Sequence, residues 1–196
     1  ALNLSPILLQ NHLKLNLTLR SVSTKSYFAD PGAIAAAAMF DPTKPVMEGS
    51  RFGGYFTYTD NSGNPSLLAP ANPLSLLEQP EDKGLSNRNL VNVSVDYALH
   101  FLPALHTGLN LGYDRAVNRR SYYTPGQMAR YSMQNGFMWK NKQSLENTLL
   151  EFFLSHTQRL EALRSSLNLT AGVASLETDE VNEYGEHTDV DKHQLA

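Results

Sequence analysis

The chain has 196 residues, a net charge of −3 and 41% hydrophobic residues, which is enough material for one sizeable domain. The negative charge gives binding to nucleic acid no electrostatic support, and the absence of cysteine excludes disulfides and thiolate metal sites. No apolar run approaches the roughly 20 residues of a transmembrane helix, and no basic segment of a signal peptide stands at the start. We expect the chain to be a fragment of a larger protein.

The first strands of the chain are predicted by leucines at every second position. A short strand at 1–5 and a turn region at 6–11 precede a full strand at about 12–24. Its apolar positions are Leu13, Leu15, Leu17 and Leu19, and its polar positions include Lys14, Asn16 and Thr18. A period of two places the leucines on one face and the polar residues on the other. One face therefore prefers an apolar environment, and the other prefers water.

A long connection is expected at about 25–88, because it holds seven of the ten prolines and six of the twelve glycines. Such a long irregular stretch in a compact domain is uncommon and usually functional. It contains two short predicted helices. Asp30 and Pro31 provide the N-cap and first position for a helix at 32–40, and Asn72 and Pro73 do so for one at 74–79.

The segment 60–64 begins like a calcium-binding loop but is better explained as a hairpin turn. Counted from Asp60, the twelfth position is Ala71, where a calcium loop requires a bidentate glutamate. The composition Asp-Asn-Ser-Gly-Asn is typical of turns. The six histidines show no paired metal-ligand spacing either. We therefore expect neither a metal site nor another cofactor.

The remaining strands are predicted in two hairpins. The first consists of 89–101 and 106–115, which a tight turn joins at 103–104. A second long connection is expected at 116 to about 142. The second hairpin consists of 143–157 and 162–176, and an acidic tail at 177–196 is expected to stop without a terminating element.

The segment 145–163 also fits a helix. Its apolar residues recur at helical spacings, so the local pattern leaves helix and strand about equally supported. As a strand, it would place Thr148, Leu150, Phe152 and Leu154 toward lipid, and Asn147 and Glu151 toward the interior. A glutamate among apolar residues requires a hydrated or paired environment.

Two all-β architectures explain the alternating strands. Strands of about thirteen residues exceed the roughly 9–11 that cross a bilayer, and their connections are alternately short and very long. This favours antiparallel transmembrane β-barrel strands, with long extracellular loops that contain short helices. The alternative is a soluble antiparallel sheet with one face in a core and the other in water. About six strands are too few to enclose cargo, so the barrel hypothesis requires a fragment of a larger barrel.

Residues 27–34 and 40–46 resemble a family motif, "FADTGAI…FDPTQPV", and residues 52–56 with 63–65 resemble the stretch that follows it. The family is SusC/RagA, the TonB-dependent outer-membrane transporters of Bacteroidetes. Residues 72–79 resemble "NPLALLEQ", and 96–114 resemble the hairpin "DYKFHFLPDLHANLNLGYD". Residues 149–154 and 168–172 resemble the strands "LLEFYL" and "DVTAGY". The resemblance covers nearly the whole chain and favours strand, turn and strand at 145–163.

The resemblance implies a plugged barrel of about 22 strands in the outer membrane. It implies a SusD-like lipoprotein lid outside, and energy from the TonB complex through an N-terminal part that this chain lacks. All of 1–196 would then belong to one barrel domain, without the plug domain and the TonB box. The implied function is import of oligosaccharides or oligopeptides, which is transport and not enzymatic catalysis. The alternatives to this function are a TonB-dependent siderophore receptor and a soluble ligand-binding sheet.

Aromatic residues of the two long connections are the candidate ligand contacts, because such rings stack on sugars and on peptide side chains. They are Tyr55, Phe56, Tyr58, Tyr122, Tyr123 and Trp139. The same rings are equally explained by packing within the loops or by the aromatic girdle of a barrel. No serine, histidine and acid arrangement suggests hydrolysis. The substrate itself, glycan or peptide, is not encoded in these motifs.

Overall fold

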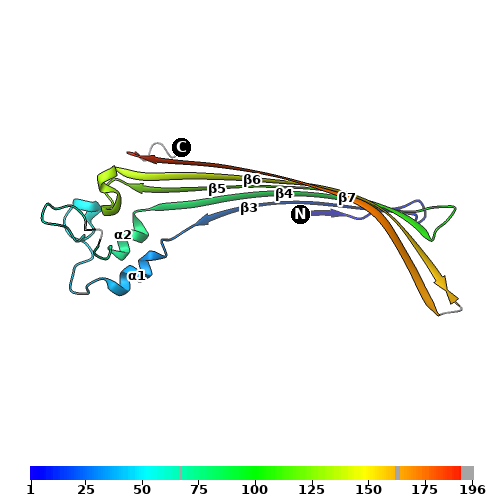
Figure 1. Ribbon diagram of the computed structural model, residues 1–196, viewed down its shortest axis with the longest axis horizontal. Helices are drawn as coiled ribbons and strands as arrows, with labels where there is room; N and C mark the ends of the chain where they lie inside the picture. Colours follow the sequence, from blue (N-terminus) through cyan, green and yellow to red (C-terminus); the bar gives the residue numbers. More distant parts are fainter. Residues whose placement is uncertain (67, 162–163, 191–196) are drawn as a thin grey trace. The chain divides into compact units, whose positions relative to one another are not determined.

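The computed structural model describes residues 1–66, 68–161 and 164–190, and most of these residues form one antiparallel β-sheet (Figure 1). The strands are β1 (Leu2–Leu4), β2 (Ile7–Leu8), β3 (Leu13–Tyr27), β4 (Glu81–Ala98), β5 (Leu105–Pro125), β6 (Gly136–Leu160) and β7 (Ser165–Thr188). The helices are α1 (Gly32–Met39) and α2 (Pro73–Glu78), with 3₁₀ turns η1 (Arg51–Gly54) and η2 (Ala129–Gln134). No helix in the described ranges has the length and hydrophobicity needed to cross a membrane.

The strands follow one another in the order β1-β3-β4-β5-β6-β7, and β2 also pairs with β3. Strands β3 to β7 therefore lie side by side in chain order, as in a meander. The register of β1 on β3 places Leu2 opposite Leu19 and Leu4 opposite Leu17, so leucines share one face across this pair. Within the described residues β1 and β2 lie at one edge of the sheet and β7 at the other, and the sheet is open.

The chain divides into two compact units, and the five long strands contribute to both. The first unit consists of 1–23, 86–117 and 143–181, and the second of 24–85, 118–142 and 182–196. The first contains strand segments and short turns. The second contains the helices, the long connection and the remaining strand segments. Residues 191–196, the last part of the predicted tail, lie outside the described residues.

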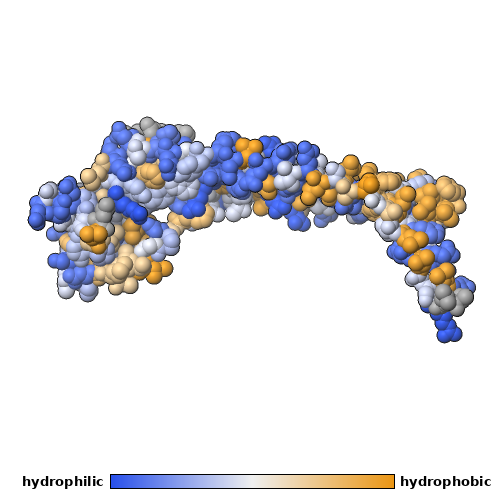
Figure 2. All heavy atoms as spheres, in the orientation of Figure 1, coloured by the Kyte–Doolittle hydropathy of each residue, from blue (hydrophilic) through white to orange (hydrophobic). Residues whose placement is uncertain are grey.

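The first unit exposes large apolar side chains on alternate positions of its strands. On β6, Leu150, Phe152 and Leu154 are 48%, 44% and 41% exposed. On β7, Leu167, Leu169 and Val173 are exposed in the same alternating way. Figure 2 shows hydrophobic residues gathered over the strands of this unit. The apolar face of this unit therefore has no protein layer over it in the described chain.

The opposite face of the first unit carries polar side chains that bind one another across the strands. The amide Nδ2 of Asn110 on β5 donates a hydrogen bond of 3.0 Å to Oε2 of Glu151 on β6. On β4 and β5, Asp96 Oδ1 lies 3.1 Å from His106 Nδ1. Glu151, which sequence analysis placed on the interior face, therefore has a polar partner there.

The second unit has a small core between its helices and η2. Ala33 and Ala36 of α1 are buried against Leu76 of α2 and Met128. The start of α2 explains why the helix forms where it does. The side chain of Asn72 accepts hydrogen bonds from the N–H groups of Leu74 and Ser75, and Pro73 occupies the first position. The predicted helix at 74–79 is thus confirmed to within one residue at each end.

The helix at 32–40 and the turn at 60–64 are also confirmed. Helix α1 spans Gly32–Met39, although its N-cap is Pro31 and not Asp30. In the turn, the N–H of Asp60 donates to the carbonyl of Asn64, and that of Gly63 donates to the carbonyl of Asp60. The carboxylate of Asp60 accepts from the backbone N–H groups of Asn64 and Ser62, and these bonds lower its pKa. These bonds fix the turn within the chain itself.

The predicted boundaries of both long connections were wrong. Strand β3 extends to Tyr27 and β4 begins at Glu81, so the first connection is 28–80 and not 25–88. The second is 126–135 and not 116–142, because β5 extends to Pro125 and β6 begins at Gly136. These strand ends lack a regular alternation of apolar and polar residues. Cross-strand pairing extends them, and a search for apolar alternation does not detect it.

Two further predictions were tested at the end of the chain. The segment 145–160 is strand and not helix, as the resemblance favoured, whereas 162–163 lie outside the described residues. The acidic tail from 177 was expected to stop without a terminating element, and β7 continues through most of it, to Thr188. Near the start, part of the predicted turn region at 6–11 is the two-residue strand β2, and Leu9, Gln10 and Asn11 form the turn with positive φ.

Candidate ligand-binding site

An arginine at the end of β5 organises the aromatic residues of the second unit. We define the arginine–aromatic cluster as Phe28, Asp82, Arg120, Tyr122, Trp139 and Tyr184. The guanidinium carbon of Arg120 lies 4.2 Å from the ring centroid of Phe28 and 5.4 Å from that of Trp139. Both distances are within the range of cation–π attraction.

Asp82 on β4 fixes the orientation of this guanidinium. Arg120 Nε donates to Asp82 Oδ1 at 2.9 Å, and a terminal nitrogen donates to Oδ2 at 2.7 Å. A bidentate pair holds the guanidinium plane in one orientation, which a lysine cannot reproduce. Asp82 also accepts, through its backbone carbonyl, the N–H of Phe28. The same residue thus positions both partners of the Phe28–Arg120 contact.

Trp139 on β6 joins the cluster to further rings. It stacks on Tyr122 with ring centroids 6.0 Å apart and an interplanar angle of 13°, and it lies 6.3 Å from Tyr184 of β7. Tyr122 is also 6.3 Å from Phe137, which stacks on Tyr131 at 5.1 Å. Burial raises the pKa of the half-buried Tyr122, so its hydroxyl stays protonated and able to donate near neutral pH. The result is a run of aromatic rings across three strands.

The loop aromatics form a separate group. Phe40, Phe56 and Tyr58 contact one another edge to face, with centroid distances of 6.0 Å, 5.9 Å and 5.0 Å. Lys44 Nζ lies 6.0 Å from the centroid of Phe56. Two of the predicted ligand residues, Phe56 and Tyr58, therefore contact each other and an additional ring that the sequence did not single out.

A cavity of about 430 Å³ lies beside these rings. Tyr58 lines it, together with Met39, Met128 and Arg130. Four alanines contribute much of the remaining wall, namely Ala35, Ala36, Ala69 and Ala71. The alanine run of α1, to which sequence analysis gave no role, therefore has a structural consequence: its methyl groups leave space where larger side chains would fill it.

The other two predicted residues have packing roles. Tyr55 donates its hydroxyl to Glu78 Oε2 at 2.5 Å, which links η1 to α2. Tyr123 is 7% exposed and packs with Met138 and Val190. The structure therefore brings Tyr122 and Trp139 together, and Phe56 and Tyr58 together, but leaves Tyr55 and Tyr123 outside both groups. Whether any of the six contacts a ligand stays a prediction.

Sequence analysis missed Phe28, Arg120 and Tyr184. A signal for Arg120 was present, because Arg120 and Tyr122 are two residues apart and share a face of a strand. It was overlooked because this segment was assigned to a connection. Among the described residues no group of three histidine, aspartate or glutamate side chains is arranged to hold a metal ion.

Replacing Arg120 by lysine tests how far this arginine holds the cluster together. We expect Arg120→Lys to keep the charge but lose the bidentate pair and the planar contact with Phe28 and Trp139. The expected cost is about 1–2 kcal/mol in the local opening free energy. Hydrogen exchange of the amides in β5 near residue 120 measures it. Exchange as slow as in the wild type would show that the cluster does not depend on the guanidinium.

Comparison with known proteins shows similarity to a TonB-dependent receptor. The chain is 37% identical over 126 residues to a curated protein of Bacteroides thetaiotaomicron, "TonB-dependent receptor SusC". The match covers 57% of this chain. The chain is thus related in sequence to a TonB-dependent receptor.

The matched region spans 13% of the length of that relative. No family model matches the chain. The β-rich fold agrees with such a relation, and the sheet corresponds to an open section without barrel closure.

Proposed function

We propose that the chain is a section of the barrel of a TonB-dependent outer-membrane importer. The observation that carries the proposal is the similarity to TonB-dependent receptor SusC. The distribution of apolar side chains in the first unit supports it independently. That distribution favours the membrane hypothesis over the soluble-sheet alternative, whereas periodicity alone left both open.

A soluble sheet buries its apolar face in a core. Of the buried apolar residues in the described chain, only Ala98 belongs to the first unit. Many of its large apolar side chains are instead exposed, and its cross-strand hydrogen bond between Asn110 and Glu151 lies on the polar face. In a transmembrane barrel, lipid covers the first face and the lumen borders the second.

The lengths of the strands support the same proposal. Strands β4 to β7 have 18 to 25 residues, whereas about 9–11 are needed to cross a bilayer. The polar ends, such as Glu81 to Arg88 of β4, are then expected to extend beyond the hydrocarbon region. Extended strands of this kind give the long connection a rigid base outside the membrane.

The cargo we propose is an oligosaccharide or an oligopeptide, recognised between the barrel and a SusD-like lipoprotein lid. The arginine–aromatic cluster and the rings of Phe56 and Tyr58 are suited to stacking on sugars or on peptide side chains. Energy from the TonB complex would act through the plug. Transport then depends on a shift between closed and open lid states, and no bond in the cargo is broken.

Purification of the tagged full-length protein tests the proposal. We expect it to require detergent for extraction from outer membranes, and to co-purify with one lipid-modified protein in about equal amount. Recovery in the aqueous phase without detergent would contradict the importer and support the soluble module. Detergent-dependent extraction as an active receptor without any lipoprotein would contradict the lid and support the siderophore-type alternative.

A further inference from the structure

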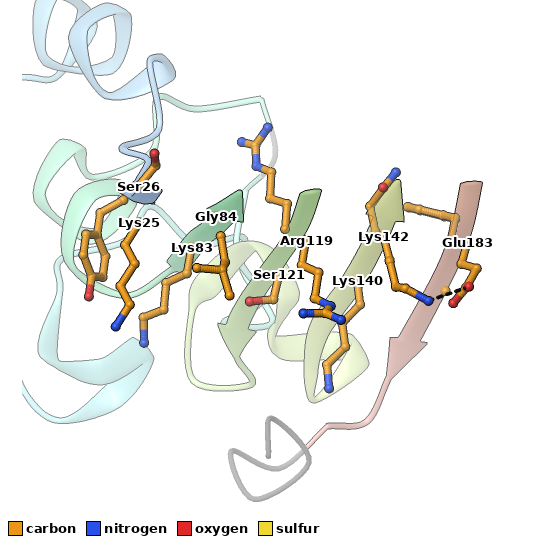
Figure 3. Close-up of a pocket in the computed structure, with 15 residues that line it drawn as sticks. Lys25, Ser26, Lys83, Gly84, Arg119, Ser121, Lys140, Lys142 and Glu183 are labelled. Atoms are coloured by element: carbon orange, nitrogen blue, oxygen red, sulfur yellow. Dashed lines mark hydrogen bonds and ion pairs between the residues drawn. The ribbon is translucent and has the colours of Figure 1, made fainter. Parts of the chain in front are cut away.

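A basic hollow lies on the strands of the second unit, apart from the cavity beside the helices. Its volume is about 650 Å³ (Figure 3). Six cationic residues from four neighbouring strands line it, namely Lys25, Lys83, Arg119, Arg120, Lys140 and Lys142. Figure 3 shows Lys25, Lys83, Lys140 and Lys142 extending to one side of the strands, while Ser26 points to the other. We call this feature the basic hollow.

The basic hollow borders the arginine–aromatic cluster, because Arg120 and Tyr184 of the cluster also line it. Lys25 alternates with Ser26, and Arg119 with Arg120, along β3 and β5. On β6, Lys140 is adjacent to Trp139 of the cluster. Alternation therefore places the side chains of Lys25 and Arg119 on the strand face opposite that of Ser26 and Arg120. The charge of Arg120 is already paired with Asp82.

The positive charge of the hollow is only partly compensated. Lys83 pairs with Glu81 at 2.6 Å, and Lys142 with Glu183 at 2.8 Å. Among the residues that line the hollow in the described chain, Glu183 is the only acid. Lys25 and Arg119 have no hydrogen-bond or ion-pair partner within the described residues. Like charges held close together disfavour the folded state unless anions from outside neutralise them.

The hollow also offers an apolar contact. Tyr27 lines it and is 77% exposed, and Leu85 lines it from the neighbouring strand. An exposed aromatic ring beside cations suits a ligand that has both anionic groups and a face that stacks, and a sugar ring has such a face. A single inorganic anion would not use this ring.

The width of the basic hollow indicates a ligand with several anionic groups. Neighbouring strands lie about 4.8 Å apart, so the cations of β3 and β6 are separated by three strand spacings, about 14 Å. One phosphate or carboxylate reaches only neighbouring strands. A chain of sugars with charges at intervals reaches the whole set.

We propose that the basic hollow binds an anionic saccharide that carries several phosphate or carboxylate groups. Such groups occur in the glycolipid of an outer-membrane leaflet and in free acidic oligosaccharides, and the chemistry of recognition is the same for both. The inference goes beyond the import function, because it concerns binding at the cationic side chains of the hollow and not the passage of cargo. It does not depend on which cargo is transported.

The test compares two double variants of the full-length protein in detergent. Lys25→Gln with Arg119→Gln removes the two unpartnered cations of the hollow. Lys14→Gln with Arg20→Gln is the matched control, because it removes one lysine and one arginine from exposed positions outside the hollow. The probes are lipopolysaccharide with a phosphorylated core, hexagalacturonate, neutral maltohexaose and hexaglutamate. Isothermal titration calorimetry at low salt measures the dissociation constants.

We expect lipopolysaccharide, hexagalacturonate or both to bind, with affinity on the order of tenfold lower in the hollow variant and unchanged in the control. Binding is expected to weaken as salt increases. Binding of lipopolysaccharide identifies the glycolipid as a source of the ligand, and binding of hexagalacturonate identifies free acidic oligosaccharides as a source. No binding of either, an equal loss in both variants, or equally tight binding of hexaglutamate or maltohexaose would overturn the proposal. Far-UV circular dichroism verifies that each variant is folded.

Discussion

Replacing Leu17 by arginine is expected to reduce sharply the amount of folded protein in the outer membrane. Leu17 is a central member of the alternating leucines of β3, and it pairs with Leu4 of β1 on the proposed lipid face. An arginine near the bilayer midplane of a transmembrane barrel costs about 2–4 kcal/mol. Heat-modifiable migration in electrophoresis, in which the folded barrel migrates differently from the unfolded chain, measures the folded fraction.

The matched control is the neighbouring residue. Asn16 is exposed on the polar face of the same strand, so Asn16→Arg adds the same side chain toward the proposed lumen. We expect it to fold in nearly wild-type yield, because lumen positions tolerate charge. Equal folded fractions for Leu17→Arg and Asn16→Arg would contradict the assignment of the two faces.

Replacing Asn72 by alanine is expected to destabilise the long connection most strongly. Asn72 is 5% exposed, and its side chain both caps α2 and donates from Nδ2 to the carbonyls of Val46 and Phe56, at 2.7 Å and 3.2 Å. Loss of the cap costs about 1 kcal/mol, and an unsatisfied buried carbonyl adds about 1–3 kcal/mol. We expect hydrogen exchange at the amides of Leu74 and Ser75 to accelerate by more than tenfold.

Asn72→Asp separates the two roles of this side chain. Aspartate keeps an oxygen that accepts from Leu74 and Ser75, but it has no N–H for Val46 and Phe56. We expect protection of α2 to be largely retained, while the segment around Phe56 becomes more accessible to protease. If both variants leave exchange and proteolysis unchanged, Asn72 does not join the helix to the loop.

The elements that were predicted correctly depend on local chemistry. Asn72 and Pro73 define the start of α2 through bonds to residues two and three positions away, so the sequence contains the whole signal. The turn at 60–64 is likewise fixed by bonds from Asp60 to its neighbours. The alternating leucines predict a two-faced strand for the same reason.

The elements that were missed depend on pairing between distant segments. The strand ends near Glu81 and Pro125 form because neighbouring strands continue beside them, and no local sequence pattern records this. The contact of Arg120 with Phe28 and Trp139 requires the register of three strands. The candidate aromatic residues were therefore found as a set, but their division into two groups and two packing residues came only from the structure.

The central claim is that the chain crosses the outer membrane, with the long connection outside and the short turns inside. The absence of cysteine allows a direct measurement with single introduced cysteines. Asn61→Cys lies in the exposed turn of the long connection, and Pro103→Cys lies in the exposed short turn between β4 and β5. A membrane-impermeant maleimide is applied to intact cells and to permeabilised cells, with other accessible cysteines of the full-length protein removed.

We predict that Cys at position 61 is labelled in intact cells, and that Cys at position 103 is labelled only after the outer membrane is permeabilised. Labelling of position 103 in intact cells, or protection of position 61 until permeabilisation, would contradict the proposed orientation. If the protein is recovered only in the soluble fraction, with both positions labelled equally, the result would contradict the transmembrane barrel itself.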